Sequence, residues 1–256
     1  MLQSLFIKET SVVLFVLILI RVSSFLLSSS IFSAVQIPVP VKILFSLSMS
    51  LIIYELNRNV ILPVDGLIIF YAAKEVLIGL CLGMVTRFFF HAIAMGSEII
   101  SMSIGLSAAS TFNPINGVNS NLIEQFQGLL AILVFLSIQG HHLLVGAITQ
   151  SFDFVPLTAT SVKIAGVSEF VLWTKNLFEI AIKIAAPIVS SIFLVNLSMG
   201  ILGRAVPQIN VFVTSFQVTI LIGFLVLFIS MPLFLNGMVS IVDLTQSELY
   251  KLMRSF

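Results

Sequence analysis

The feature that most constrains this chain is the length of its uncharged apolar stretches. Residues 184–202 and 211–242 contain no Asp, Glu, Lys or Arg, so Arg204 is the only formal charge between Lys183 and Asp243. Over 256 residues, 59% are hydrophobic and 9% are charged, and the mean hydropathy is +1.17, whereas soluble domains carry about 25% charged residues. One soluble core cannot hide so much apolar surface, so we expect an integral membrane protein. The net charge of +1 supplies no basic patch for nucleic acid.

Apolar segments of this length are predicted to be α-helices. Backbone groups inside hydrocarbon must bond to one another, and the segments are too long and too evenly apolar for barrel strands of alternating polarity. The sequence therefore predicts an all-α fold of membrane-type helical hairpins. The predicted helices cover residues 10–33, 37–56, 66–86, 88–108, 122–139, 177–202 and 210–235.

The stretch GRAVPQINVF, residues 203–212, interrupts the most apolar region of the chain. Gly203 can terminate a helix, Pro207 disfavours helix at Val206, and Asn210 is a suitable N-terminal cap for the next helix. We interpret this stretch as the tip of a long helical hairpin.

The usual membrane anchors are sparse in this sequence. It contains one Trp and three Tyr against 23 Phe, and its basic residues show no bias toward one set of loops. Serine is dense in RVSSFLLSSSIFS, residues 21–33. Our hypothesis is that much of the surface faces other protein subunits or a wet lumen rather than lipid.

Small residues recur at a spacing that lets two helix backbones approach closely. Gly79 and Gly83 are four residues apart, Gly96 follows Ala92 at the same spacing, and Gly105 is also assigned to helix packing. Glu75 lies one turn before Gly79, with Lys74 beside it. Glu75 is either a paired or terminal charge or, alternatively, part of a proton relay.

The segment ASTFNPINGVNSN, residues 109–121, is the clearest break in the apolar pattern. Asn-Pro and Asn-Gly both favour turns, so a polar loop between two apolar helices is expected. Two interpretations stay open. The loop is a solvent-exposed connector, or it re-enters the membrane depth, where irregular backbone is tolerated only inside protein or beside water.

No residue pattern indicates an enzyme. The sequence lacks a Walker loop, GxGxxG, HExxH and GxSxG, and we expect neither a cofactor nor a metal ion. Adjacent His141 and His142 would point about 100° apart on a helix and have no acidic or cysteine neighbour at ligand spacing, so GHH indicates a helix-end turn. SFDFVP, residues 151–156, similarly predicts a helix end followed by a turn. The lone Cys81 is expected to pack in an apolar run.

Five motifs follow one another over nearly the whole chain. They are IPVPVK at 37–42, GLSAASTFNP at 105–114, GHHLL at 140–144, SFDFVP at 151–156 and MGILGRAVPQINVFVTSFQ at 199–217. In this order they resemble the FliR/SctT export-gate family of flagellar and virulence type III secretion systems. The hairpin-tip motif is the strongest match and looks more like the flagellar branch. Its matching residues are Gly203, Arg204, Pro207, Gln208, Asn210 and Phe212.

The resemblance implies a subunit of a helical export gate built with the P and Q proteins, beside other membrane components of the export apparatus. Such a gate would pass unfolded flagellar proteins across the bacterial inner (cytoplasmic) membrane, within the flagellar basal body. Residues 1–165 would be P-like, and residues 166–256 would be a Q-like hairpin with its tip at 203–210 and a C-terminal segment. Such family members are lifted largely out of the membrane plane, which agrees with the sparse anchors.

By the same resemblance, the loop at 110–121 would be the plug that occupies the closed channel. The residues assigned to it are Ser110, Thr111, Phe112, Asn113, Pro114, Ile115, Asn116 and Gly117. Family members often carry an aspartate before the plug proline, where this chain has Asn113. A charge-based account of closure therefore does not transfer, and shape and polar hydrogen bonding would close the pore.

Two alternatives to a flagellar gate subunit stay open. One is the virulence injectisome counterpart of the same subunit. The other is a multi-helix secondary transporter that binds a small substrate near residues 113–117. Such transporters often show inverted repeats with matching broken segments, and no convincing pair of halves is visible here. A transporter should work when reconstituted alone, whereas a gate subunit should need its partners.

Overall fold

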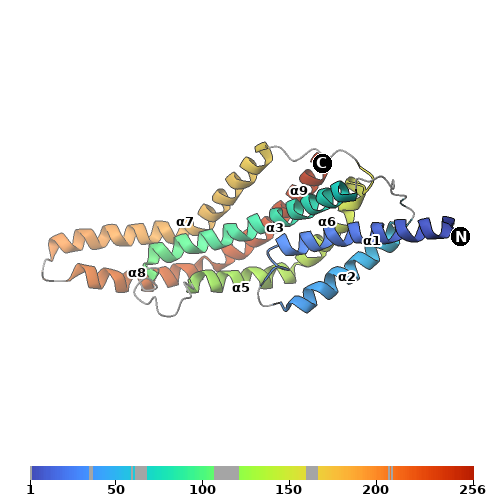
Figure 1. Cartoon of the computed structure of the whole chain (residues 1–256). Coiled ribbons are helices and arrows are strands. Elements are labelled where there is room, and N and C mark those ends of the chain that lie inside the picture. The colour runs from blue at the N-terminus through green and yellow to red at the C-terminus, as the bar shows by residue number, and fades with distance from the viewer. Residues whose placement is uncertain are drawn as a thin grey trace. The chain divides into compact units, whose positions relative to one another are not determined.

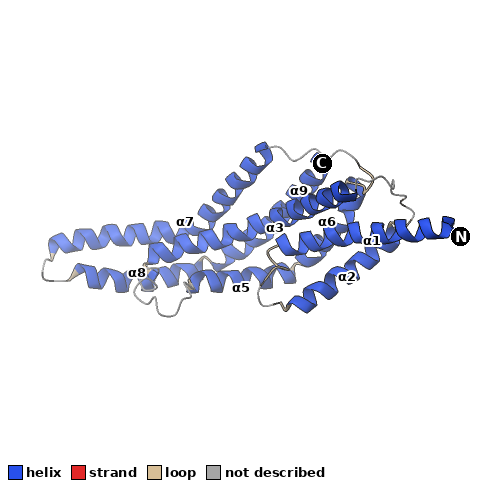
Figure 2. Cartoon of the chain, in the orientation of Figure 1, coloured by secondary structure: helices blue, strands red, loops and turns tan. Residues whose placement is uncertain are grey.

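The computed structural model describes residues 2–34, 37–58, 60, 68–106, 121–159, 167–206, 208 and 210–256. These residues form helices, turns and loops without a strand (Figure 2). The all-α prediction is confirmed. In the labels of Figure 1, the helices are α1 (Leu2–Ser28), α2 (Val39–Leu56), α3 (Ile68–Ile104), α5 (Leu122–Ser137), α6 (Gly140–Phe154), α7 (Val167–Ala205), α8 (Val211–Ile229) and α9 (Met231–Ser255).

The chain divides into two compact units that interleave along the sequence. Unit 1 contains Met1–Phe88, Gln139–Trp173 and Asp243–Phe256, and unit 2 contains Phe89–Ile138 and Thr174–Val242. The long helices α3, α7 and α9 therefore contribute residues to both units.

In unit 1, one face of α1 supplies a large part of the core. Its buried apolar side chains recur at the three- and four-residue spacing of one helix face. They are Leu14, Leu17, Ile18, Val22 and Phe25. On α3, Ile78, Leu82 and Val85 are buried in the same way.

Two glycines of α3 allow the backbones of α1 and α3 to approach closely. A Cβ atom on Gly79 would lie 2.5 Å from the carbonyl oxygen of Arg21, and one on Gly83 would lie 2.7 Å from that of Phe25. Ser28 Oγ donates a hydrogen bond to the carbonyl of Gly79 at 3.3 Å. Any side chain at these positions would force the helices apart, which is the usual reason for small residues at such interfaces.

The core of unit 2 joins four helices, α3, α5, α7 and α8. Its buried residues are Ile100, Ile104, Ile123, Ala185, Ile188, Ile192 and Leu227. Gly96 lies where α3 meets α7, since its Cβ would be 3.0 Å from the carbonyl oxygen of Ala181. Gly223 of α8 would similarly carry a Cβ 2.6 Å from Ile104 Cγ1. Glycine therefore sets the helix separation in this unit as well.

Four helices in the described part of the chain are long and apolar enough to cross a membrane, judged by length and composition. They are Ser11–Ser28 of α1, Val39–Leu56, Ile68–Ile104 and Val171–Ala205. Two bent pairs, α5 with α6 and α8 with α9, raise the number to six if each pair forms one span. The membrane-type helical fold expected from the sequence is confirmed.

The division of α3 into two helices at Arg87 was wrong. One helix runs from Ile68 to Ile104 and carries Arg87 on an exposed position. Arginine is a good helix former and its side chain leaves the backbone hydrogen bonds intact. The charge of Arg87 therefore indicates an exposed position on this helix and not the end of the helix.

The helix end predicted at residue 139 agrees with the break between α5 and α6, which bend by 69° where Gln139 has a φ of 59°. The helix that follows, α6, was missing from the predicted ranges. The arm predicted over 210–235 is divided, with a bend of 56° between α8 and α9. Pro232 explains this second break, because it has no N–H to donate to the carbonyl of Phe228.

The start of α7 was placed ten residues too late. It begins at Val167 rather than at Leu177, so the helix also includes Thr174, Lys175 and Asn176. The hydropathy pattern excluded this polar first part although it is helical.

Leucine at Gly79 should destabilise the protein strongly, because its side chain would meet the backbone of α1. We expect Gly79→Leu to lower the free energy of unfolding by about 3 kcal/mol. Gly146→Leu is the matched control, since a Cβ at Gly146 of α6 has no atom within 4 Å. Thermal unfolding in detergent measures both, and equal losses would contradict the close α1–α3 contact.

Candidate functional site

The hairpin tip lies between α7, which ends at Ala205, and α8, which begins at Val211. The two helices run side by side in Figure 1. Asn210 caps α8, because its side chain accepts a hydrogen bond from the backbone N–H of Val213 at 3.4 Å. The hydroxyl of Thr214 donates to the Asn210 carbonyl at 3.1 Å. The predicted cap is confirmed.

Gly203 does not end the first arm as predicted. It lies inside α7, which continues to Ala205, and the N–H of Val206 still bonds to the carbonyl of Leu202 at 2.9 Å. A Cβ on Gly203 would lie 2.9 Å from Val211 Cγ2. The missing side chain therefore makes room for the start of α8.

Arg204 occupies the last turn of α7 and is exposed, as is Gln208. A cation near a helix C-terminus interacts favourably with the helix dipole. Within the described ranges, no hydrogen bond or ion pair joins the Arg204 side chain to another residue. Pro207 and the side chain of Phe212 lie outside the described residues.

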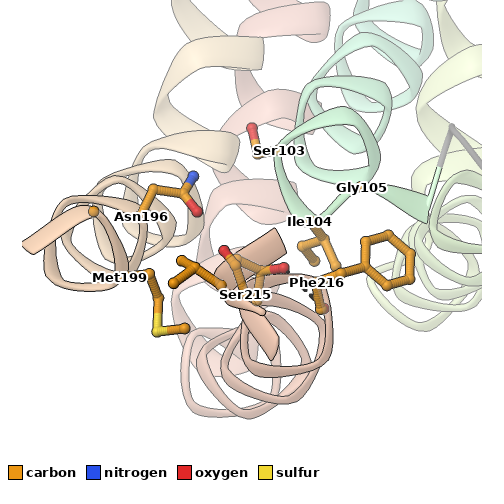
Figure 3. Close-up of a pocket in the computed structure, with 10 residues that line it drawn as sticks. Ser103, Ile104, Gly105, Asn196, Met199, Ser215 and Phe216 are labelled. Atoms are coloured by element: carbon orange, nitrogen blue, oxygen red, sulfur yellow. Dashed lines mark hydrogen bonds between the residues drawn. The ribbon is translucent and has the colours of Figure 1, made fainter. Parts of the chain in front are cut away.

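A cavity of about 440 Å³ opens in unit 2 where the end of α3 meets α7 and α8. Figure 3 shows Asn196 of α7 and Ser215 of α8 pointing toward the same space, with Ser103 of α3 nearby. The lining residues are Ser103, Ile104, Gly105, Asn196, Met199, Gly200, Val211, Ser215, Phe216 and Thr219. The structure thus brings Gly105 beside the start of α8, close to the hairpin tip.

The lining of this cavity combines apolar and polar side chains and carries no charge. Ser103 Oγ donates to the carbonyl of Ile99 at 2.7 Å, and Thr219 Oγ1 donates to that of Phe216 at 3.0 Å. The side chains of Asn196 and Ser215 have no hydrogen-bond partner among the residues that the structure describes. The cavity can therefore bind by hydrogen bonds and apolar contact, without charge recognition.

Gly105 ends α3 at the edge of this cavity. Its φ of +91° lies in the left-handed region that favours glycine. Its N–H bonds to the carbonyls of Ser101 and Met102, each at 3.1 Å. A Cβ here would lie 3.1 Å from the ring of Phe216. Gly105 thus combines the end of a helix with close packing.

All residues assigned to the plug, from Ser110 to Gly117, lie outside the described residues. The structure describes only the anchors on either side. Gly105 ends α3 before the loop, and Asn121 caps α5 after it, accepting hydrogen bonds from Ile123 N–H at 3.1 Å and Glu124 N–H at 3.4 Å.

Unit 1 contains a buried cluster of three charges from α1 and α3. The guanidinium of Arg21 forms an ion pair with Glu75, and both side chains are fully buried. Lys74 Nζ lies 3.2 Å from the other carboxylate oxygen of Glu75. The cluster therefore contains two cations around one carboxylate.

The two cations are also bonded to backbone carbonyls at the end of α6. Arg21 donates to the carbonyls of Ser151 and Val155, each at 2.9 Å. Lys74 donates to the carbonyls of Pro156, Leu157 and Ala159, at 3.0 to 3.3 Å. The Arg21 guanidinium lies 4.1 Å from the ring centre of Phe152. This cluster therefore holds the end of α6 and the following turn against α1 and α3.

The paired-charge interpretation of Glu75 is confirmed, whereas its partner Arg21 was missed. Arg21 is the only formal charge between Glu9 and Lys42. A charge inside an apolar helix usually needs a partner on a neighbouring helix. The isolated position of Arg21 in the sequence could therefore have indicated Glu75 as its partner, since Glu75 is the only acidic residue of α3 before Glu98.

The described side chains offer no group of three His, Cys, Asp or Glu residues that could hold a metal ion. His141 and His142 lie in the first turn of α6, with ring centres 4.3 Å apart. The turn predicted at GHH lies instead at Ile138 and Gln139, and GHH is helical. As predicted, a helix ends within SFDFVP, since α6 ends at Phe154.

The profile of the bacterial export proteins, family 1, matches residues 12–245. The chain belongs to this family. It is 32% identical over 235 residues to the flagellar biosynthetic protein FliR of Bacillus subtilis (strain 168), covering 90% of this chain and 91% of that protein.

Other members of the family are less similar but match over most of their length. FliR of Escherichia coli (strain K12) is 27% identical over 219 residues, which cover 84% of this chain and 83% of that protein. FliR of Aquifex aeolicus (strain VF5) is 26% identical over 215 residues, with 83% of each chain covered. Membership in this export family gives the chain a role in transport.

Removing the carboxylate of Glu75 should destabilise unit 1, because it leaves two buried cations unpaired. We expect Glu75→Gln to lower the free energy of unfolding by about 3 to 5 kcal/mol. Adding Arg21→Gln should cost less than the sum of the single changes, since the two groups interact. Thermal unfolding in detergent measures this cycle.

Glu179→Gln is the matched control for that experiment. It breaks an ion pair with Lys183 whose side chains are 49% and 72% exposed, so its effect on stability should be much smaller. If Glu179→Gln lowered the free energy of unfolding as much as Glu75→Gln, the buried ion pair would be no more stabilising than an exposed one, which would contradict this prediction.

Proposed function

We propose that this chain is a membrane subunit of the flagellar type III protein export gate. In this role it forms part of the helical channel through which unfolded flagellar proteins cross the inner membrane. The observation that carries the proposal is the family match over residues 12–245, together with relatives named as flagellar biosynthetic proteins. The partners would be the P and Q export-gate proteins and other membrane components of the export apparatus.

The surface of α7 supports a role inside a larger assembly. Its exposed residues include large aliphatic side chains such as Leu194 and Ile201, but also Lys183, Glu179 and Asn196. At the centre of a lipid-exposed helix, a lysine or an acid costs about 2.5 to 3.5 kcal/mol on insertion scales. Contact with other subunits or with water in a lumen avoids this cost.

The proposed plug is residues 110–121. Two anchored ends support this assignment, because Gly105 stops α3 in a left-handed conformation and Asn121 caps α5. The sequence between them is polar and rich in asparagine. A polar segment with fixed ends can change its arrangement at modest cost, as switch segments do.

The further proposal is that residues 1–165 correspond to a P protein and residues 166–256 to a Q-like hairpin. The family resemblance supports this division, and the hairpin of α7 and α8 with its tip at 203–210 falls in the second part. These two parts differ from units 1 and 2. The parts are continuous in sequence, whereas each unit is defined by spatial contacts and combines separate segments of the chain.

The flagellar assignment is favoured over the injectisome counterpart by the names of the relatives, which are all flagellar biosynthetic proteins in the matches given above. The described cavity does not support the alternative of a small-substrate transporter, because it lies at the end of α3 and has no charged lining residue.

Deletion of residues 111–119 should open a leak if this segment is the plug. We expect higher ion conductance through the reconstituted gate, because polar side chains no longer fill the channel at rest. Planar-bilayer recording measures the conductance, and co-purification of the partners verifies that the assembly persists. The control is Asn196→Ala in the cavity, which leaves the loop intact. Unchanged conductance in an intact assembly would contradict the plug assignment.

A further inference from the structure

One glycine in the lining of the unit 2 cavity has no packing role within the described chain. Gly200 lies inside α7 at an exposed position. A Cβ atom on Gly200 would have no atom within 4 Å. Glycine in the interior of a helix is destabilising relative to alanine. Helix α7 therefore carries a destabilising residue that no close contact within this part of the chain explains.

The other glycine of the lining differs from Gly200. Gly105 has a φ of +91°, and its Cβ would lie 3.1 Å from the ring of Phe216. Gly200 has neither a positive φ nor a close neighbour. Three further glycines share these open surroundings but do not line the cavity; they are Gly128, Gly146 and Gly237. Gly200 thus combines an open helix surface with a neighbouring cavity.

The cavity beside Gly200 suits an apolar side chain. Its larger side chains include Ile104, Met199, Val211 and Phe216, and none of its lining residues is charged. A charged occupant would lose its hydration without gaining a partner of opposite charge. The volume of about 440 Å³ leaves room for a bulky side chain. The occupant is therefore expected to be apolar at the point where it enters.

The lining also favours an occupant whose backbone is helical. Each residue of an extended chain carries an N–H and a C=O group that need partners. The hydroxyls of Ser103 and Thr219 already donate within their own helices. A helix bonds its backbone groups internally, so it can lie against such a surface. Glycine on one helix lets the backbone of another approach closely, whereas an acyl chain gains nothing from it.

We propose that this cavity, between α7, α8 and the end of α3, receives a bulky apolar side chain from a helix of another export-gate subunit. The backbone of that helix crosses α7 at Gly200. The partner helix comes from the proposed hetero-oligomer, so this assignment rests on the proposed function. It adds the place of contact on this chain and the kind of side chain that enters.

Substitutions at Gly200 should change stability and assembly in opposite directions. Gly200→Ala should raise the melting temperature of the full chain, purified without partners in detergent, by about 2 to 4 °C, because alanine favours the helix. Gly200→Leu should lower the amount of P and Q proteins that co-purify with the tagged chain by about tenfold, because leucine occupies the space of the partner helix. A lower melting temperature for Gly200→Ala would mean that Gly200 packs within the chain, and would overturn the proposal.

Gly146→Leu is the matched control for assembly. Gly146 lies in equally open surroundings on α6 and outside the cavity, so its leucine variant should retain both partners. Full retention of the partners by Gly200→Leu would overturn the assignment of the cavity. Equal losses in the two variants would mean that any bulky exposed side chain disturbs assembly, and would overturn it as well. A wild-type chain that retains neither partner would contradict the proposed function itself, and the partner helix would fall with it.

Photo-crosslinking from the cavity identifies the occupant without a change at Gly200. Phe216 lines the cavity and is 43% exposed, and p-benzoyl-phenylalanine would replace it in the chain co-expressed with P and Q. Irradiation of the purified complex should join this position to an apolar residue in a helix of P or Q, as mapped by mass spectrometry. Gly200→Leu should remove that product. Adducts only with lipid, with an exported protein or with this chain itself would overturn the proposal.

Discussion

The buried ion pair between Arg21 and Glu75 is the interaction on which unit 1 depends. Helices that are apolar on most of their surface can slide or rotate past one another at small cost, because one aliphatic contact replaces another. A buried charge removes this freedom, since it is stable only opposite its partner. Arg21 and Glu75 therefore define one register of α1 against α3, and Gly79 and Gly83 then let the two backbones close.

The same cluster fixes the end of α6. Arg21 bonds to the carbonyl of Ser151 near the end of α6, and Arg21 and Lys74 supply donors for carbonyls of the turn that follows, while Glu75 balances their charge. The motif SFDFVP thus contributes carbonyl oxygens and the hydroxyl of Ser151 to this cluster.

The exposed side of α7 mixes large aliphatic residues with Glu179, Lys183 and Asn196. Polar and charged side chains on this side are better accommodated by protein or water than by hydrocarbon. This composition fits the proposed gate subunit.

Much of the fold could be predicted from the sequence, because hydropathy determines the fold class and local capping residues determine some of the helix ends. The all-α membrane fold, the hairpin between α7 and α8, and the cap at Asn210 were predicted correctly. The break at Arg87 was wrong, since charge alone does not end a helix, and α9, which begins at Met231 beside Pro232, was missed as a separate helix. Arg21 was not connected to Glu75, because a contact across 54 residues depends on tertiary packing that no local pattern records.

The central claim is that this chain works as one subunit of a hetero-oligomeric export gate. The most direct test is purification of the tagged chain in mild detergent, after expression with and without its P and Q partners, followed by native mass spectrometry. The account predicts a discrete hetero-oligomer that contains this chain when the partners are present. A stable monomer or homodimer under both conditions would contradict it.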